Sequence, residues 1–452
     1  MTPCGIPAGC FLKKMNRYIK IFLLSLIIVV ASGLAALFIF PEMRSAEDPA
    51  EGYATVSDDE FMPTVSAPVV SLETITDVSD NSASENTVSA DVAEGPKPGE
   101  EGNPALTMEM RLPAPHGMGD ELYVSTAGAV TGEKESYTLC FAGDVLFDPG
   151  YAIYANYQRQ GSVLEKCISE DLLEIMRSED FMMINNEFPY SERGAALEGK
   201  TYTFRAKPAS VSLLGEMGVD AVSVANNHAY DFGGDAFLDT LDTLEGAEIP
   251  HVGGGRNLEE ASRPLYVYAG DDKIAIIAAS QIERYGTPHS KGATEDGAGI
   301  LRSYPNIDPT LDAIKKAKEE GAYVILFIHW GTENETAADW AQNEQLPKFI
   351  DAGVDCVIGG HPHILQGISY VDGVPVIYSL GNFWFNSKTI DTGMVELEWA
   401  DGGVKNIRFI PCRQSGCGVK LLHDSEAQAL ISYMQSLSPN VNIDAEGYIT
   451  AK

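Results

Sequence analysis

The chain has 452 residues, of which 44% are hydrophobic, so it can bury a sizeable core and is long enough for more than one region. It has 31 Lys and Arg against 65 Asp and Glu, a formal net charge of −34. This charge would repel a nucleic-acid backbone and argues against a nucleic-acid partner. It would also repel an acidic polymer, except where bound metal ions reverse the local sign.

Residues 21–40 form an apolar run without formal charge that is long enough to cross a bilayer as one helix. Basic residues precede this run and acidic residues follow it. The positive-inside rule therefore predicts a single-pass signal anchor in the cell membrane, with residues 1–20 in the cytoplasm and the rest of the chain outside. A cleaved signal peptide is the alternative, but no small-x-small cleavage site is evident near Phe40.

Residues 41–136 are rich in Ser, Thr, Pro and acidic residues. They contain few basic side chains, namely Arg44, Lys97, Arg111 and Lys134. Such a segment cannot bury enough apolar surface to offset the entropy lost on ordering. It is predicted to be an acidic, disordered linker that carries the folded domain away from the membrane.

From Tyr137 onward, short apolar runs alternate with helical patterns, which predicts an α/β domain over 137–425 with central sheets flanked by helices, and a C-terminal tail over 426–452. The predicted strands are Tyr137–Ala142, Phe181–Ile184, Ala221–Val224, Ile274–Ala279, Tyr323–Ile328, Cys356–Ile358 and Val376–Ser379, with a final antiparallel pair at Met394–Trp399 and Val404–Ile410. The predicted helices are Leu164–Arg177, Ala209–Met217, Gly234–Leu244, Asn257–Ala261, Leu311–Glu320 and Asn343–Ala352.

Two smaller features have competing interpretations. Gly253, Gly254 and Gly255 are predicted to form a turn into the next helix, because no Lys-Ser/Thr follows them as a phosphate-binding loop would require. The seven cysteines include no C-x-x-C pair, and Cys412 and Cys417 could pair only in an oxidising compartment.

Polar side chains follow several of the predicted strands where each strand ends. The segments are Gly143-Asp144, Asn185-Asn186-Glu187, Asn226-Asn227-His228, His329-Trp330-Gly331-Thr332-Glu333 and His361-Pro362-His363. One such residue alone is most simply a helix cap, a turn residue or a core histidine. Because ligands bind beyond the carboxyl ends of strands in open α/β sheets, the conjunction predicts a functional site there.

The residue types at these strand ends indicate a metal site. Imidazoles and carboxylates together suit Zn, Mn or Fe, whereas an all-oxygen set would suit Mg or Ca. The absence of a thiolate argues against a closed structural zinc site. Because a carboxylate can bridge two ions, and two-metal sites stabilise displacement at phosphorus, one or two divalent metal ions are predicted.

The ordered motifs GDV, NNEFP, ANNHAYDFG, HWGTE, GGHPHILQGI and YSLGNFWF resemble those of the CapA, or poly-γ-glutamate capsule synthesis, family. That family is similar to the calcineurin-like metallophosphoesterases. The resemblance covers roughly residues 137–385 and implies a calcineurin-like metallophosphoesterase-type layered domain. It also implies an anionic surface polymer such as poly-γ-glutamate, and other capsule synthesis membrane proteins, as partners.

Carried over residue by residue, the resemblance implies six metal ligands. They are Asp144, Glu187, Asn227, His329, His361 and His363. Asp144 and His363 would bind one metal, and Asn227 with the other two histidines would bind a second. Glu187 would bridge the two ions.

The resemblance also implies that His228 lies above the metals as a general acid or as a donor that stabilises charge. Asp231 would orient it. One position departs from the wider superfamily, whose first motif is Asp-x-His, because Leu146 occupies the third place here. This removes one ligand from the first metal, so a mononuclear site is an alternative.

Two functions therefore compete. The first is a metal-dependent hydrolase or transferase that acts outside the membrane on a phosphoester or an anionic surface polymer. The second is a non-catalytic, polymer-binding accessory protein of a capsule assembly complex. A purely structural ectodomain is disfavoured, because packing alone does not explain the clustered ligands.

Overall fold

The computed structural model describes residues 108–112, 123–125, 136–282 and 290–452. The predicted cytoplasmic segment, the predicted anchor and most of the predicted linker lie outside these residues. Within the described part of the chain, no helix has the length and apolarity needed to cross a membrane. Two short parts of the predicted linker form strands where composition predicted disorder, namely β1 (Met108–Leu112) and β2 (Tyr123–Ser125).

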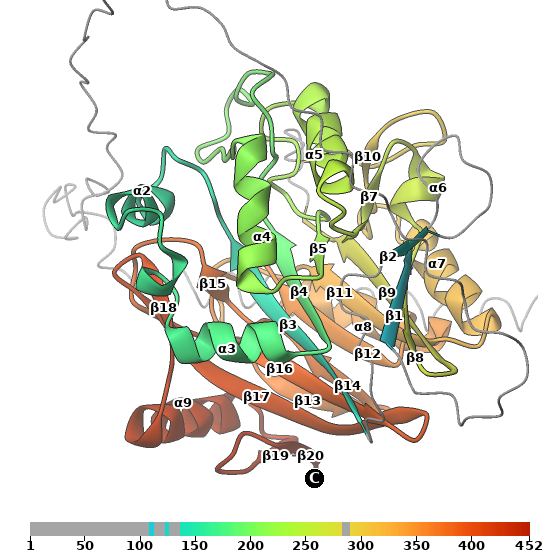
Figure 1. The fold of residues 1–452 in the computed structure, drawn as a ribbon. Coiled ribbons are helices and arrows are strands. Elements are labelled where there is room, and N and C mark those ends of the chain that lie inside the picture. The colour runs from blue at the N-terminus through green and yellow to red at the C-terminus, as the bar shows by residue number, and fades with distance from the viewer. Residues whose placement is uncertain (1–107, 113–122, 126–135, 283–289) are drawn as a thin grey trace, which may run out of the picture. The chain divides into compact units, whose positions relative to one another are not determined.

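Most strands among the described residues belong to two large sheets (Figure 1). The first sheet has the order β18 (Gly418–Leu421), β17 (Gly403–Ser415), β16 (Ile390–Ala400), β3 (Tyr137–Val145), β4 (Phe181–Asn186), β5 (Ala221–Ser223) and β6 (His251–Val252), and β15 (Asn382–Trp384) also pairs with β3. Strands β3 to β6 are parallel, so their carboxyl ends meet at one edge of this sheet.

The second sheet has the order β13 (Ile368–Val371), β14 (Val374–Ile377), β12 (Cys356–Gly360), β11 (Tyr323–His329), β9 (Asp272–Ser280), β8 (Leu265–Ala269), β1 and β2. Its central strands β9, β11, β12 and β14 are parallel. Their carboxyl ends therefore also share an edge.

The two sheets pack face to face through alternate side chains of their strands. In β3, Leu139 and Phe141 join the cluster between the sheets, whereas Cys140 and Ala142 face the other way. This alternation follows from the period-two geometry of a strand. The ring of Phe141 stacks on Phe327 of β11, with centroids 6.1 Å apart. Both faces of the central strands are buried, which explains their continuous apolar sequence.

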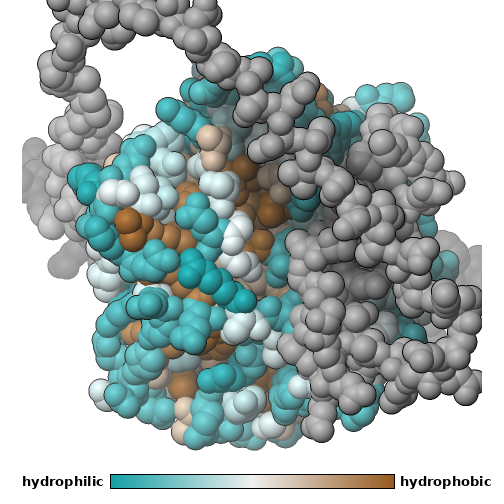
Figure 2. All heavy atoms as spheres, in the orientation of Figure 1, coloured by the Kyte–Doolittle hydropathy of each residue, from teal (hydrophilic) through white to brown (hydrophobic). Residues whose placement is uncertain are grey.

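Helices cover the outer face of each sheet (Figure 1). The first sheet is covered by α3 (Glu170–Ser178), α4 (Ser212–Met217) and α5 (Gly234–Gly246), and the second by α7 (Asp308–Glu319) and α8 (Trp340–Ala352). The predicted mixed α/β domain with central sheets flanked by helices is confirmed. On the face shown in Figure 2, hydrophobic side chains are scattered in small groups among hydrophilic ones.

The remaining elements are short or lie toward the chain's C-terminal end. They are α2 (Ala152–Arg159), η2 (Leu164–Lys166), η3 (Pro208–Val211), β7 (Gly254–Gly255), α6 (Leu258–Ala261), β10 (Gly299–Ile300), α9 (Asp424–Leu437), β19 (Val441–Ile443) and β20 (Ile449–Ala451). Residues 426–452, predicted as a tail, thus contain most of α9 and a hairpin. Leu430, Met434 and Val441 join the cluster between the sheets.

The prediction of one continuous helix over Leu164–Arg177 is wrong, because the chain forms two separate helical segments there. The chain forms the short η2, leaves the helical conformation at Ser169, and then begins α3. The interruption has a non-local cause, because the main chain at Ile168 and Ser169 pairs with Val419 of β18. Local periodicity carries no information about this pairing.

Gly253, Gly254 and Gly255 are required by close packing. A Cβ at Gly254 would lie 2.5 Å from the Val224 side chain, and one at Gly253 would lie 2.6 Å from the Ala278 carbonyl oxygen. The helix that follows, α6, begins at Leu258, and the side chain of its N-cap residue Asn257 accepts the Glu260 N–H. Cys412 and Cys417 are both free, so this alternative pairing is not formed.

Phe141 offers a test of the packing between the sheets. We expect Phe141→Ala to lower the free energy of unfolding by about 3–5 kcal/mol, because a fully buried ring is lost from a close-packed layer. Guanidinium unfolding followed by circular dichroism would measure the change. Tyr202→Ala, at a side chain that is 47% exposed, is the matched control and should change stability little. Equal stabilities for the two variants would contradict this packing.

A candidate metal centre at the carboxyl ends of the strands

The predicted metal ligands lie at the carboxyl ends of strands from both sheets. In the first sheet Asp144 lies near the end of β3, Glu187 follows β4, and Asn227 lies in the loop after β5. In the second sheet His329 ends β11, while His361 and His363 follow β12. The packing of the two sheets brings these side chains together into two overlapping groups.

The first group contains Glu187, His329 and His361, all buried. The Nε2 atom of His329 lies 3.6 Å from Glu187 Oε1 and 3.1 Å from His361 Nδ1. Asn227 Oδ1 lies 2.7 Å from the same nitrogen. Four atoms that can offer a lone pair to a cation thus gather around one point.

The second group contains Asp144, Glu187 and His363. His363 Nδ1 lies 3.2 Å from Asp144 Oδ2 and 2.8 Å from Asn382 Oδ1. The side-chain amide of Asn185 donates to Asp144 Oδ1 at 2.7 Å and contacts Glu187 Oε2 at 3.2 Å, which holds the two carboxyl groups beside each other. Glu187 belongs to both groups, where the resemblance predicted a bridging carboxylate.

The loop that carries the two histidines after β12 is held in an unusual backbone conformation. His361 has a φ of 95° and His363 a φ of 61°, in a region that residues other than glycine adopt at a cost. The Asn334 N–H donates to the Pro362 carbonyl between them at 2.9 Å. The surrounding structure therefore imposes the direction of both imidazoles.

Burial dominates the electrostatics of the cluster. It raises the pKa of the Glu187 carboxyl well above its ordinary value, and the neighbouring Asp144 adds to this shift. It lowers the pKa of His329 and of His361 well below the ordinary imidazole value. For His363, burial lowers the pKa, but the hydrogen bond and charge of Asp144, together with the Glu333 charge and the Asn382 hydrogen bond, outweigh burial, so the pKa is raised.

The residues present fit a divalent cation. Within the described part of the chain, the Oε1 atom of Glu187 is buried and has no hydrogen-bond donor, which is costly for a carboxyl oxygen. The nearest imidazole nitrogens lie 3.6 and 3.9 Å away. A cation would give this oxygen a partner and would use the lone pairs of the neutral imidazoles. The mixture of nitrogen and oxygen donors suits Zn, Mn or Fe.

His228, predicted as a general acid, lies beside the two groups. Its Nδ1 atom lies 2.6 Å from Asp231 Oδ2, and its Nε2 atom lies 3.9 Å from Glu187 Oε1. The ring stacks on Phe204 at a centroid distance of 4.1 Å. The Asp231 carboxyl therefore contacts the Nδ1 side of the His228 ring.

Three further residues that were not predicted as ligands contact this site, namely Asn185, Asn382 and Lys200. Asn185 lies near the carboxyl end of β4, within one of the predicted strand-end segments, whereas Asn382 is the first residue of β15. Lys200 comes from an irregular loop and gave no signal, yet its Nζ lies 2.6 Å from the Asn227 carbonyl oxygen and 2.5 Å from Asp231 Oδ1. Glu333, in the strand-end segment that begins at His329, is exposed.

Leu146 is fully buried in the hydrophobic cluster beneath the first sheet's helices. Its N–H donates to the Trp384 carbonyl at 3.0 Å. The side chain therefore takes part in packing. The position that carries a histidine ligand in the wider superfamily supplies no ligand here.

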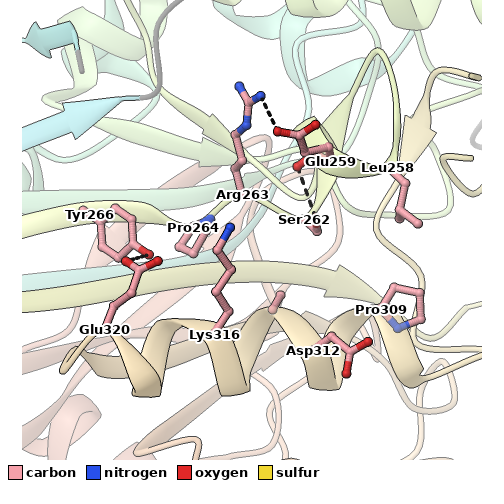
Figure 3. Close-up of a pocket in the computed structure, with 11 residues that line it drawn as sticks. Leu258, Glu259, Ser262, Arg263, Pro264, Tyr266, Pro309, Asp312, Lys316 and Glu320 are labelled. Atoms are coloured by element: carbon pink, nitrogen blue, oxygen red, sulfur yellow. Dashed lines mark hydrogen bonds and ion pairs between the residues drawn. The ribbon is translucent and has the colours of Figure 1, made fainter. Parts of the chain in front are cut away.

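A separate cavity of about 440 Å³ lies between α6 and α7 (Figure 3). Its charged side chains include Arg263, which pairs with Glu259, and Glu320, which accepts a hydrogen bond from Tyr266. No predicted site residue lines it. The arrangement of its side chains indicates no particular ligand.

The fold and the site together define a class, namely α/β domains with a buried histidine–carboxylate cluster that fits divalent cations. Residues 138–387, more than half of the chain, match the family described as "Bacterial capsule synthesis protein PGA_cap". The chain belongs to this family, the CapA family, which is part of the metallophosphoesterase-like superfamily.

Relatives in several bacteria are similar over much of the chain. "Capsule biosynthesis protein CapA" of Bacillus anthracis is 26% identical over 290 residues, covering 62% of this chain and 68% of the relative. "PGA biosynthesis protein CapA" of Bacillus subtilis (strain 168) is 28% identical over 242 residues, covering 52% and 62%. A "Probable polyglutamine synthesis accessory protein" of Mycobacterium tuberculosis is 26% identical over 280 residues, covering 58% and 74%.

Among solved structures, the Thermus thermophilus sulfate thiohydrolase SoxB in complex with glycerol is 15% identical, with a TM-score of 0.36. The match covers 67% of this chain and 61% of that one.

The raised pKa of Glu187 gives a test in metal-free protein. In the presence of a chelator, the parent should lose stability as the pH rises from the ordinary Glu value through the raised folded value, because the unfolded chain ionises first. Glu187→Gln should remove this loss, which thermal melts across pH would show. Glu344→Gln, at an exposed carboxyl on α8, is the control and should melt like the parent. A parent-like pH profile for Glu187→Gln would contradict the assignment.

Proposed function

We propose that this chain is a membrane-anchored, extracytoplasmic CapA-like protein of capsule or poly-γ-glutamate synthesis or export. We further propose that it is a metal-dependent hydrolase or transferase that acts on a phosphoester or an anionic surface polymer. The observation that carries this proposal is the buried Glu187 carboxyl, which is shared by two ligand groups and has one oxygen without a donor. A packing role would leave no reason for this arrangement.

Six side chains would hold the metal. In the proposed assignment, Asn227, His329 and His361 bind one ion, Asp144 and His363 bind another, and Glu187 lies between the two groups. When bound, divalent cations would supply Lewis-acid chemistry to an oxygen of the substrate. The two stacked sheets, with the site at the carboxyl ends of their strands, also support a calcineurin-like metallophosphoesterase-type fold.

His228 would act as the general acid, or as a hydrogen-bond donor to developing charge. Asp231 holds the Nδ1 side of the ring, so Nε2 is the atom directed toward Glu187 and the ligand groups. From there it can donate a proton to a leaving group, or a hydrogen bond to charge that develops on the transferred group. Stacking on Phe204 restricts rotation of the ring and keeps Nε2 in place.

The acidic composition of the chain means that an anionic substrate would need a local positive charge in order to bind. With a formal charge of −34, the chain as a whole would repel an acidic polymer. Divalent cations held by the cluster would make one point attractive to phosphate or carboxylate groups. The names of the Bacillus relatives refer to capsule and PGA biosynthesis, which supports a surface polymer as the partner.

A non-catalytic role is the second candidate. The name of the mycobacterial relative includes "accessory protein", which favours a role in assembly. In this role the metal cluster would bind carboxylates of the growing polymer without cleaving it. Other capsule synthesis membrane proteins would then be its partners.

Metal content is the first measurement for the full-length chain purified in detergent. We expect the parent to retain a transition metal and the His361→Ala, His363→Ala double variant to lose it, because both candidate groups lose a ligand. His423→Ala is the matched control, since its exposed imidazole pairs with Asp171 away from the cluster. A parent without bound transition metal would contradict the proposed centre.

Turnover distinguishes the two candidate functions. The metal-loaded parent should hydrolyse an aryl phosphate or shorten poly-γ-glutamate, and the double variant should lose this activity while His423→Ala retains it. A metal-loaded parent that binds poly-γ-glutamate without cleaving either compound would support the accessory role. Polymer cleavage retained in the metal-free double variant would show that the cluster is not catalytic.

The proposed location has its own test. Protease added to intact cells should degrade the domain beyond residue 136, and deletion of residues 1–40 should remove the protein from the membrane fraction. A domain protected from protease in intact cells and degraded only after lysis would contradict an extracytoplasmic location.

A further inference from the structure

A loop over residues 192–203 leads from the region after β4 toward η3, and most of its side chains are exposed. Lys200 is different, because its side chain is only 3% exposed. Burying a lysine is costly unless its ammonium group finds several partners. The groups that Lys200 contacts should therefore show why its side chain is buried.

The ammonium group of Lys200 contacts three groups of a single turn, residues 226–231. Its Nζ lies 2.5 Å from Asp231 Oδ1, 2.6 Å from the Asn227 carbonyl oxygen and 3.3 Å from His228 Nδ1. An ion pair with Asp231 alone would not require the other two contacts. The lysine is thus attached to the main chain of one candidate metal ligand and lies against the ring of the candidate proton donor.

Asp231, the last residue of the turn, also accepts hydrogen bonds from the main chain of the loop region. Its Oδ2 accepts the Phe204 N–H at 2.7 Å, and its carbonyl oxygen accepts the Leu197 N–H at 2.8 Å. Phe204 in turn stacks on His228. The loop and Phe204, the residue that follows it, are therefore fixed to the turn by two main-chain N–H groups, by the Phe204 ring and by Lys200.

We propose that Lys200 is a positioning residue of the metal centre, whose ammonium group fixes where Asn227 Oδ1 and His228 Nε2 point. By holding the Asn227 carbonyl and the Asp231 carboxylate together, it sets the conformation of the turn between them. Asn227 Oδ1 is then held 2.7 Å from His329 Nε2, within the first ligand group. This inference rests on the proposed function insofar as that cluster binds metal.

The probe is Co²⁺, whose visible absorption reports the geometry of its ligands, added to the full-length chain after metal removal. We expect Lys200→Met to weaken Co²⁺ binding by roughly 10–100-fold, the usual effect of losing a residue that orients a ligand, and to change the Co²⁺ spectrum. Lys207→Met removes the same charge from an exposed side chain nearby and should match the parent. Lys200→Arg, which keeps the charge and several donors, should restore part of the affinity.

Lys200→Met leaves Asp231 buried without its counter-ion, so this variant can fail to fold for that reason alone. The Lys200→Met, Asp231→Asn double variant removes both charges and avoids this problem. We expect the double variant to fold, since no unpaired charge is left buried. It should still bind Co²⁺ more weakly and show a changed spectrum, because the Asn227 carbonyl still lacks its donor. Parent-like affinity and spectrum in the double variant would overturn the proposal and leave Lys200 as an ion-pair partner only.

Hydrogen exchange separates this inference from the proposed function. If the parent binds no Co²⁺, the metal centre itself is refuted, and the amides of residues 226–231 then test the positioning role. Faster exchange of these amides in the double variant than in Lys207→Met would support Lys200 as the residue that fixes the turn. Equal exchange rates would overturn that role as well.

Discussion

The buried carboxyl group of Glu187 is the constraint on which the rest of the site depends. It lies between two histidines on one side and Asp144 with His363 on the other, and one of its oxygens has no donor within the described part of the chain. Two buried carboxyl groups beside each other are unfavourable in the absence of positive charge. A bound cation would resolve this conflict. Without one, burial raises the pKa of Glu187 and favours its neutral form.

The two-sheet architecture supplies the rigidity that such a site requires. Each ligand group combines side chains from both sheets, so the packing at Phe141 and Phe327 fixes their separation. The loops are then tied to one another, since the Gln366 side-chain amide donates to the carbonyl of Glu335 in the loop after His329. A metal centre can tolerate strained histidines such as His361 only when the surrounding structure holds them in this way.

The sequence predicted the strands and the residues at their ends, because buried parallel strands have continuous apolar sequences and polar residues appear abruptly where they stop. It could not show which ends meet, since that depends on how the two sheets pack. It missed Lys200 for a related reason: an irregular loop has no periodicity, and a lone lysine in it reads as a surface charge. The break before α3 was missed because its cause, pairing with Val419, is distant in sequence.

The two ligand groups differ in burial and in the number of metal-binding atoms that they offer. The group of Glu187, His329 and His361 is buried, and Asn227 adds a further oxygen. In the other group His363 is partly exposed, with 18% of its side chain accessible, and the position of Leu146 contributes only packing. The first group therefore offers more donors and less competition from water. A metal should fill this group first, so a site with one ion remains consistent with the same six residues.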